Sequence, residues 1–161
     1  MAEKPVPAEL AQTVDSEIAA AQCFLAFLER EQQMLVKGEV DDLLDLVRQK
    51  NKVAAELATL AARRARLLAA SGVASDGAGM AAWFAAHPEE TGTRDAWSSL
   101  LAVAVQAREL NRVNGELIQE RLQSNAQALE VLLGSNAAAG NLYGPDGQSA
   151  PPSTRRISDS A

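Results

Sequence analysis

The chain has 161 residues, a formal net charge of −6 at pH 7, 47% hydrophobic residues and only 4% aromatic residues. This length predicts one domain, and the acidic balance argues against nucleic-acid binding, which needs Lys and Arg to displace counterions from phosphates. The single cysteine, Cys23, cannot form an internal disulfide and indicates a reducing compartment, here the cytoplasm; because it stands in an apolar run, it is expected in the core.

Alanine is the most frequent residue, and residues that favour strands are scarce. Alanine has the highest intrinsic helix propensity, so the composition predicts an all-α fold. Few large side chains are available to fill a broad core. We therefore expect an elongated antiparallel helical bundle, or coiled-coil hairpin, of three long helices and one short helix, with a flexible C-terminal tail.

Residues 1–7 are expected to form a disordered arm, because two prolines disfavour an early helix start. Apolar residues then recur at threes and fours over residues 8–36, which is the period of an amphipathic helix. Gly38 supplies a C-terminal stop, and a second helix is predicted over residues 40–70. The connection between them is short, so the two helices should lie antiparallel as a hairpin.

A turn rich in Gly and Ser separates this hairpin from a short helix predicted over residues 80–86. The longest helix is predicted over residues 93–133, with Thr93 as its N-cap. The helical bundle as a whole is expected to span residues 8–134. Residues 135–161 turn to small and polar residues, so they are expected to form the flexible tail.

Four residues of the longest helix cost helix propensity: Asn111, Asn114, Gly115 and Asn125. One explanation is structural: backbones approach closely there, or a buried amide fixes the helix register, as in coiled coils. The other explanation is functional: the glycine marks a weak point at which the C-terminal half of the helix bends away and remodels.

The second half of the same helix is rich in aliphatic side chains that need partners. They are Leu117, Ile118, Leu122, Leu129, Val131, Leu132 and Leu133. Such a stripe is either part of the core or a binding surface. Towards its end the apolar surface is wider than two neighbouring helices would cover, and an excess apolar patch marks an interaction site or an oligomer contact.

The only tyrosine, Tyr143, stands beside Gly144, Pro145 and Gly147, which are typical turn residues. Tyrosine is common in binding hot spots. Tyr143 is therefore either a contact to a partner or a side chain that docks back on its own bundle.

No pattern of residues indicates catalysis. The single histidine, His87, is far in sequence from the single cysteine, so a zinc site is not expected, and no Ser/His/acid elbow or phosphate-binding glycine loop is present. The sequence predicts no cofactor, no metal and no enzyme activity. No apolar run approaches the ~20 residues that would cross a bilayer, so direct membrane insertion is not expected.

Three blocks near the C-terminus together resemble the FlgN family of flagellar export chaperones. The blocks are Asn111-Arg112-Val113-Asn114-Gly115-Glu116-Leu117-Ile118, Asn125-Ala126-Gln127-Ala128-Leu129-Glu130-Val131-Leu132 and Leu142-Tyr143-Gly144-Pro145-Asp146-Gly147-Gln148. The helices before residue 111 match the family only in general style.

The resemblance implies a cytoplasmic chaperone that binds the C-terminal part of the hook–filament junction proteins, hook-associated proteins of the FlgK and FlgL kind. It implies that the apolar residues from Leu117 to Leu133 form the client groove. It also implies that Tyr143, with Gly144 and Gly147, contacts the cytoplasmic part of the membrane protein that forms the flagellar export gate.

Two other interpretations remain open from the residues alone. The chain could be a structural helical hairpin that forms a homodimer through the same apolar stripe. An amphipathic helix on a membrane surface is a weaker alternative, because basic residues are not concentrated beside the apolar face.

Overall fold

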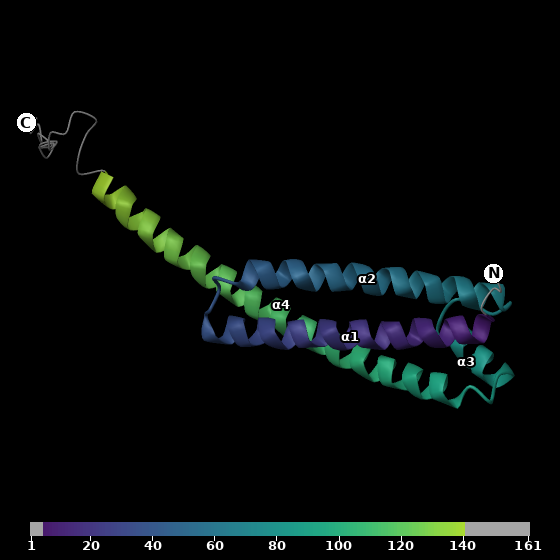
Figure 1. The fold of residues 1–161 in the computed structure, drawn as a ribbon. Helices are drawn as coiled ribbons and strands as arrows, with labels where there is room; N and C mark the ends of the chain where they lie inside the picture. Colours follow the sequence, from purple (N-terminus) through teal and green to yellow (C-terminus); the bar gives the residue numbers. More distant parts are fainter. Residues whose placement is uncertain (1–4, 141–161) are drawn as a thin grey trace, which may run out of the picture. The chain divides into compact units, whose positions relative to one another are not determined.

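The computed structural model describes residues 5–140, with side chains up to residue 134, and this part of the chain contains four helices and no strand (Figure 1). The helices are α1 (Val6–Lys37), α2 (Leu43–Ala70), α3 (Gly77–Ala86) and α4 (Thr91–Gly140). The prediction of an all-α fold with three long helices and one short helix is confirmed. The described residues form two units, one ending at Ile118 and the other beginning at Gln119.

Several helix ends differ from the predicted ones for local physical reasons. α1 begins earlier than expected, at Val6, because Pro7 occupies its first turn, where no intrahelical N–H is needed. α3 begins at Gly77, where the Asp76 carboxylate accepts a hydrogen bond from the Gly79 amide at 2.9 Å. The assignment of Thr93 as an N-cap is wrong, since α4 begins at Thr91 and continues to Gly140.

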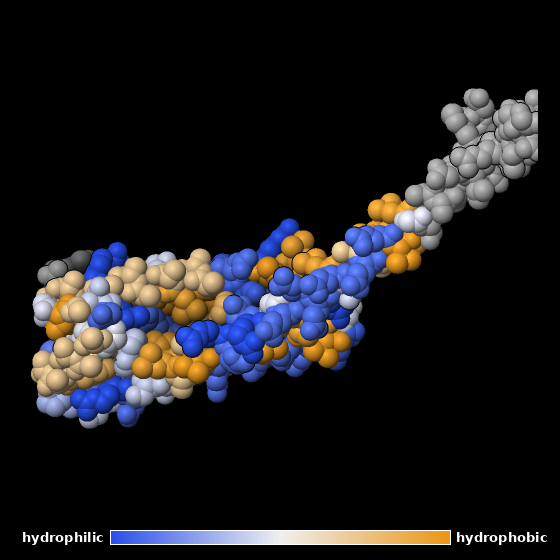
Figure 2. Space-filling view, turned by 180° about the vertical axis from the view of Figure 1, so that it is seen from behind, coloured by the Kyte–Doolittle hydropathy of each residue, from blue (hydrophilic) through white to orange (hydrophobic). Residues whose placement is uncertain are grey.

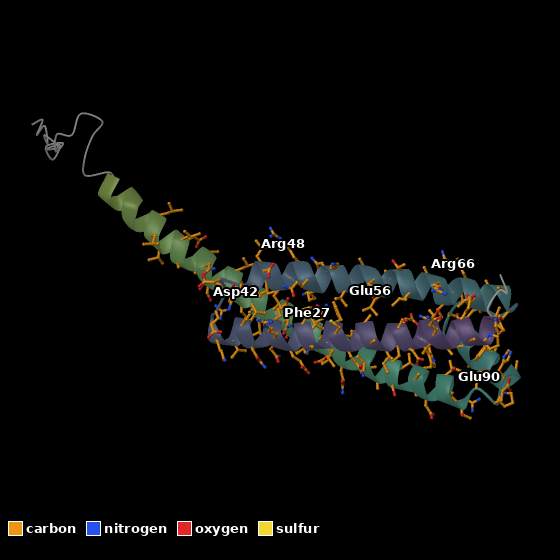
Figure 3. The ribbon with its side chains drawn as sticks, viewed as in Figure 1. Phe27, Asp42, Arg48, Glu56, Arg66 and Glu90 are labelled. Atoms are coloured by element: carbon orange, nitrogen blue, oxygen red, sulfur yellow. The ribbon has the colours of Figure 1, made fainter. Side chains whose placement is uncertain are left out.

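α1 and α2 lie side by side as an antiparallel hairpin (Figure 1). α1 ends at Gly38, which has φ 77° and adopts the left-handed conformation that closes a helix most readily when the residue has no Cβ. On the outer side of α2, Arg48 and Arg66 project away from α1 (Figure 3). The hairpin predicted from the short connection is therefore present.

The core at the open end of the hairpin is built around α3. Six buried side chains from α1, α2 and α3 form it: Leu10, Val14, Leu68, Met80, Trp83 and Phe84. Trp97 of α4 packs against this cluster. Gly79 is required in α3, because a Cβ at this position would lie 1.6 Å from the carbonyl oxygen of Ala74. The short helix α3 thus closes the open end of the hairpin, and the start of α4 packs against the same cluster.

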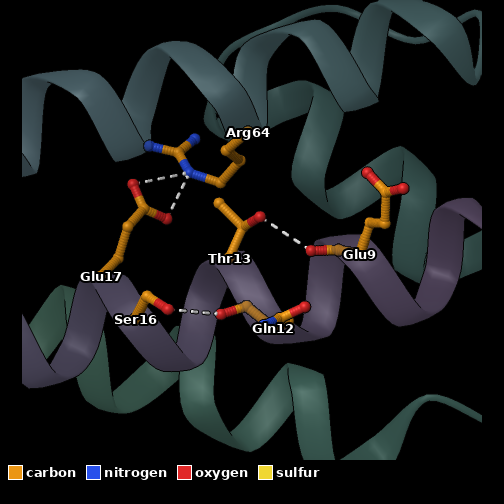
Figure 4. A network of polar contacts seen from close by, with 6 residues as sticks. All are labelled: Glu9, Gln12, Thr13, Ser16, Glu17 and Arg64. Atoms are coloured by element: carbon orange, nitrogen blue, oxygen red, sulfur yellow. Dashed lines mark hydrogen bonds and ion pairs between the residues drawn. The ribbon is translucent and has the colours of Figure 1, made fainter. Parts of the chain in front are cut away.

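Two buried ion pairs join α1 to α2 in a common register. Arg64 donates to the Glu17 carboxylate at 2.9 Å (Figure 4), and Lys50 donates to Glu31 at 2.7 Å. The glutamate side chains are 4% and 1% exposed. The two pairs stand two heptads apart on both helices, and Phe24 lies opposite Leu57 at the heptad between them.

The N-terminal half of α4 docks onto these same two layers. The Asn114 amide donates to Glu31 at 3.0 Å and to the carbonyl oxygen of Leu28 at 2.9 Å. At the other layer, the Arg64 guanidinium lies 4.7 Å from the centre of the Trp97 ring. The two ion pairs therefore position three helices.

Between the two polar layers the packing is loose. An apolar pocket of about 270 Å³ opens there, lined by Ala21, Phe24, Leu57, Leu100, Ala104, Ala107, Arg108 and Asn111. The facing residues of α4 include two alanines, which are too small to fill the space opposite Phe24 and Leu57. The polar layers, more than this apolar layer, specify how the helices align.

Cys23 is exposed, so the expectation that it belongs to the core is wrong. The apolar run around Cys23 suggested a buried position, but α1 buries only one stripe of side chains, which includes Ala21 and Leu28, and Cys23 lies outside it. Part of the two predicted terminal segments is helical: α1 includes the last residues of the predicted 1–7 arm, and α4 includes the first residues of the predicted 135–161 tail. Residues 1–4 and 141–161, with the Leu142–Gln148 block, lie outside the described residues.

Replacing Lys50 with methionine should destabilise the first unit by about 3 kcal/mol. The substitution preserves side-chain length but leaves the Glu31 carboxylate buried without its cation. Urea unfolding followed by circular dichroism measures the loss.

The control is Arg112→Met, which removes exposed ion pairs with Glu109 and Glu116. There the hydrogen bond and charge of Arg112 hold the pKa of Glu109 below its ordinary value, but water screens the interaction. The control should unfold at the wild-type urea concentration. Equal effects of the two substitutions would show that the buried pair does not hold the hairpin.

Candidate protein-binding site

The part of α4 in the first unit buries one regular stripe of side chains. Its members recur at threes and fours, the spacing of a coiled-coil seam, and we call them the docking stripe: Thr93, Ala96, Leu100, Val103, Ala107, Leu110, Asn114 and Leu117. Each is buried or half-buried. This stripe is the surface through which α4 packs on the first unit.

The part of α4 in the second unit exposes its large apolar side chains. Leu122, Leu129, Val131, Leu132 and Leu133 have exposed fractions from 58% to 69%. Hydrophobic surface is visible on both sides of the last described turns of α4 (Figure 2). An exposed apolar patch of this kind commonly marks an interaction site, so this cluster, which we call the exposed stripe, is the candidate binding site.

Except for Val131, the exposed stripe is not a continuation of the docking stripe. Continuing the spacing of the docking stripe from Leu117 leads to Arg121, Ser124, Ala128 and Val131. The leucines instead follow the series Ile118, Leu122, Asn125, Leu129 and Leu132, which is displaced by one residue and hence by about 100° around the helix. The apolar face of α4 therefore changes direction near Leu117.

The seven predicted client-binding residues are divided between the two units. Leu117 and Ile118 belong to the first unit, where Leu117 is half-buried and Ile118 is 37% exposed. The other five form the exposed stripe. The two groups differ in burial: Leu117 joins the docking stripe, and the leucines after residue 121 are exposed.

The polar residues singled out within α4 also have different surroundings. Asn114 is 1% exposed and makes the contacts to α1 described above, whereas Asn111 lies at the edge of the apolar pocket. Asn125 is exposed among the leucines. A Cβ at Gly115 would meet nothing within 4 Å, so close backbone approach does not explain this glycine.

Sequence reasoning missed some exposed apolar side chains in the first unit. Leu101 and Val105 of α4 are 48% and 64% exposed, and Val105 borders a groove shared with Leu25 of α1. Both stand in an apolar run of α4, and the sequence of such a run does not show which of its side chains face the other helices. Tyr143, Gly144 and Gly147 lie outside the described residues.

Comparison with known proteins agrees with the motif at the end of α4. A family model described as FlgN protein matches residues 1–151. The chain belongs to the FlgN family. This is a family of flagellar chaperones, and it is not known for enzyme activity.

Two relatives match most of the chain. The Flagella synthesis protein FlgN of Proteus mirabilis is 29% identical over 142 residues, which covers 87% of this chain and 89% of that protein. The Flagella synthesis protein FlgN of Yersinia enterocolitica is 28% identical over 141 residues, covering 86% and 87%. No solved structure gives a significant match.

Among the described helices, none combines the length and the apolar character that a membrane span requires.

Replacing Gly115 with alanine should stabilise α4 by about 1 kcal/mol, because the new methyl group meets open space and alanine favours helix. Hydrogen exchange of the α4 amides after residue 115 should slow. Gly134→Ala, which also meets open space, is the control and should affect only the last turns. Faster exchange in the Gly115→Ala variant would show that the glycine conformation is required.

Proposed function

We propose that this protein is a cytoplasmic export chaperone for hook-associated proteins of the FlgK and FlgL kind. It binds the C-terminal helical segment of these clients, prevents their premature assembly, and delivers them to the flagellar type III export gate. The observation that carries the proposal is the exposed stripe of α4 in a chain that belongs to the FlgN family.

The chemistry of the stripe suits a helical client. An amphipathic helix can lie along exposed aliphatic side chains that recur at threes and fours, as in other helix-in-groove complexes. Burial of one exposed leucine is worth about 1.5–3 kcal/mol, so a few such contacts supply useful affinity. The exposed fractions of Leu129 and Leu132, 58% and 61%, leave most of that surface available.

A client segment that is disordered until it binds suits a chaperone that must later release its client. Ordering the segment costs conformational entropy at the moment of binding, and this cost moderates the affinity. Release at the gate then requires only a competing contact. The proposal needs no nucleotide and no metal.

Delivery to the gate is assigned to Tyr143 and the glycines beside it, Gly144 and Gly147. The support for this assignment is the resemblance of their sequence block to the family and the suitability of tyrosine as a hot-spot residue. The proposal therefore separates two tasks: α4 binds the client, and the segment after it engages the gate.

The exposed stripe also favours a second candidate function, a homo-oligomer that covers the leucines with a second copy. Sedimentation equilibrium of the full chain over a wide range of concentration distinguishes the two. A monomer at all concentrations would eliminate the second candidate.

The double substitution Leu129→Asp and Leu132→Asp should abolish binding of the client. Charges on this face prevent burial against an apolar helix, while the exposure of both side chains predicts an unchanged fold. The measurement is calorimetric titration with a C-terminal fragment of a hook-associated protein, together with a version of the chain ending at Gln127, which should not bind.

The matched control is Val105→Asp with Leu101→Asp, two exposed apolar positions on the same helix in the first unit. This variant should bind like the wild type. Loss of binding by the control alone would place the client site in the first unit, contrary to the proposal.

Tyr143→Ala should leave client affinity unchanged and block secretion of the clients. The reason is that the tyrosine serves the gate contact and not the client contact. Calorimetry measures the first and the amount of hook-associated protein outside the cell measures the second. Equal loss of both, or of neither, would contradict this division.

A further inference from the structure

The exposed stripe has the spacing of a coiled-coil seam with a polar residue at its centre. Leu122, Asn125, Leu129 and Leu132 follow one another at intervals of three, four and three residues, which matches a heptad repeat. Asn125 therefore occupies a position that apolar residues normally fill. All four residues belong to the second unit and are exposed.

Local stability does not explain an asparagine at this place. In an exposed helix asparagine costs helix propensity relative to alanine, by up to about 0.7 kcal/mol. Asn114 is explained by its two hydrogen bonds to α1, but for Asn125 no comparable contact to another helix exists among the described residues. Asn125 is exposed, so its amide is accessible to a partner that lies against the stripe.

The residues that flank the seam near Asn125 make this residue more important for aligning a partner helix. In coiled coils, charged residues that flank the seam usually select the partner. Here the flanking positions nearest to Asn125 are Ala126 and Ala128, which carry no charge and offer no hydrogen bond. Leu133 extends the apolar character further. Among the described residues that flank the seam, Arg121 beside Leu122 is the only charged one, so ion pairs can align a partner helix at one end of this surface and the amide of Asn125 can align it further along.

We infer that Asn125 sets the register of the bound partner, and that the partner is an amphipathic helix with a hydrogen-bonding side chain within its own apolar face. A register shift by the partner would bury the Asn125 amide against aliphatic groups, which costs the full desolvation of an amide. The inference rests on the proposed function, since it concerns the client at the same surface.

The test is calorimetric titration of the full chain with a C-terminal fragment of a hook-associated protein, comparing the wild type with Asn125→Ala and Ser124→Ala. If the Asn125 amide forms a hydrogen bond to the client, its replacement leaves a polar group of the client unpaired. The dissociation constant should then rise by about fivefold or more. Ser124 lies off the seam and controls for the gain in helix propensity, so Ser124→Ala should bind at least as tightly as the wild type.

The direction in which the client affinity changes in Asn125→Ala decides whether Asn125 contacts the client. If Asn125 only faced water, alanine would favour the helix and Asn125→Ala would bind as tightly as the wild type or more tightly, which would overturn the inference. Circular dichroism checks that all variants remain helical.

Alanine substitutions along the client fragment, combined with Asn125→Ala, locate the partner side chain. One polar client residue should lose its effect in the Asn125→Ala background, and uniform additivity at every client position would count against the inference.

Failure of the inference is distinguishable from failure of the proposed function. If the wild type binds, the Leu129→Asp and Leu132→Asp variant does not, and Asn125→Ala binds normally, only the register role is wrong. If the wild type does not bind the fragment at all, the proposed function is wrong and the inference falls with it.

Discussion

The arrangement of the first unit depends on one buried carboxylate. Glu31 is 1% exposed, and it accepts hydrogen bonds from Lys50 on α2 and from Asn114 on α4. A buried charge is tolerated only where its partners are in place, so the three helices must come together at this level or the carboxylate must remain in water. Apolar packing alone would leave the register open, because alanines dominate the neighbouring layer and a pocket remains there.

Near the same layer, the apolar side chains of α4 move to a different face of the helix and become exposed. Up to Leu117 the helix buries the docking stripe within the first unit, while Leu101 and Val105 are exposed. After that the leucines appear on a different face and are exposed. A stripe that served only internal packing would keep its direction. The change of face therefore supports the proposal that the second part of the helix binds a client.

Much of the fold follows from the sequence because it depends on local signals. Alanine content, helical periodicity and the stop at Gly38 were sufficient to predict the helices and the hairpin. The helix ends were less accurate, because caps such as Asp76 depend on single side-chain contacts. Cys23 was misplaced because an apolar run does not reveal which side of a helix faces the partner.

The candidate site was only partly predictable. The leucines were identified from composition, but whether they are buried depends on contacts distant in sequence, and Leu117 and Leu122 differ in this respect. The partners of Asn114 lie on α1, so periodicity within α4 could show that an amide was unusual but not what it binds.

The equal spacing of the two ion pairs constrains the lengths of α1 and α2 between them to be equal. Between the layers Glu17–Arg64 and Glu31–Lys50, each helix contributes the same number of residues. A deletion or insertion on one helix within this interval would turn one charged side chain towards the solvent and leave its partner buried without a counter-charge. Within this interval the buried ion pairs should therefore tolerate only changes in length that are matched on both helices.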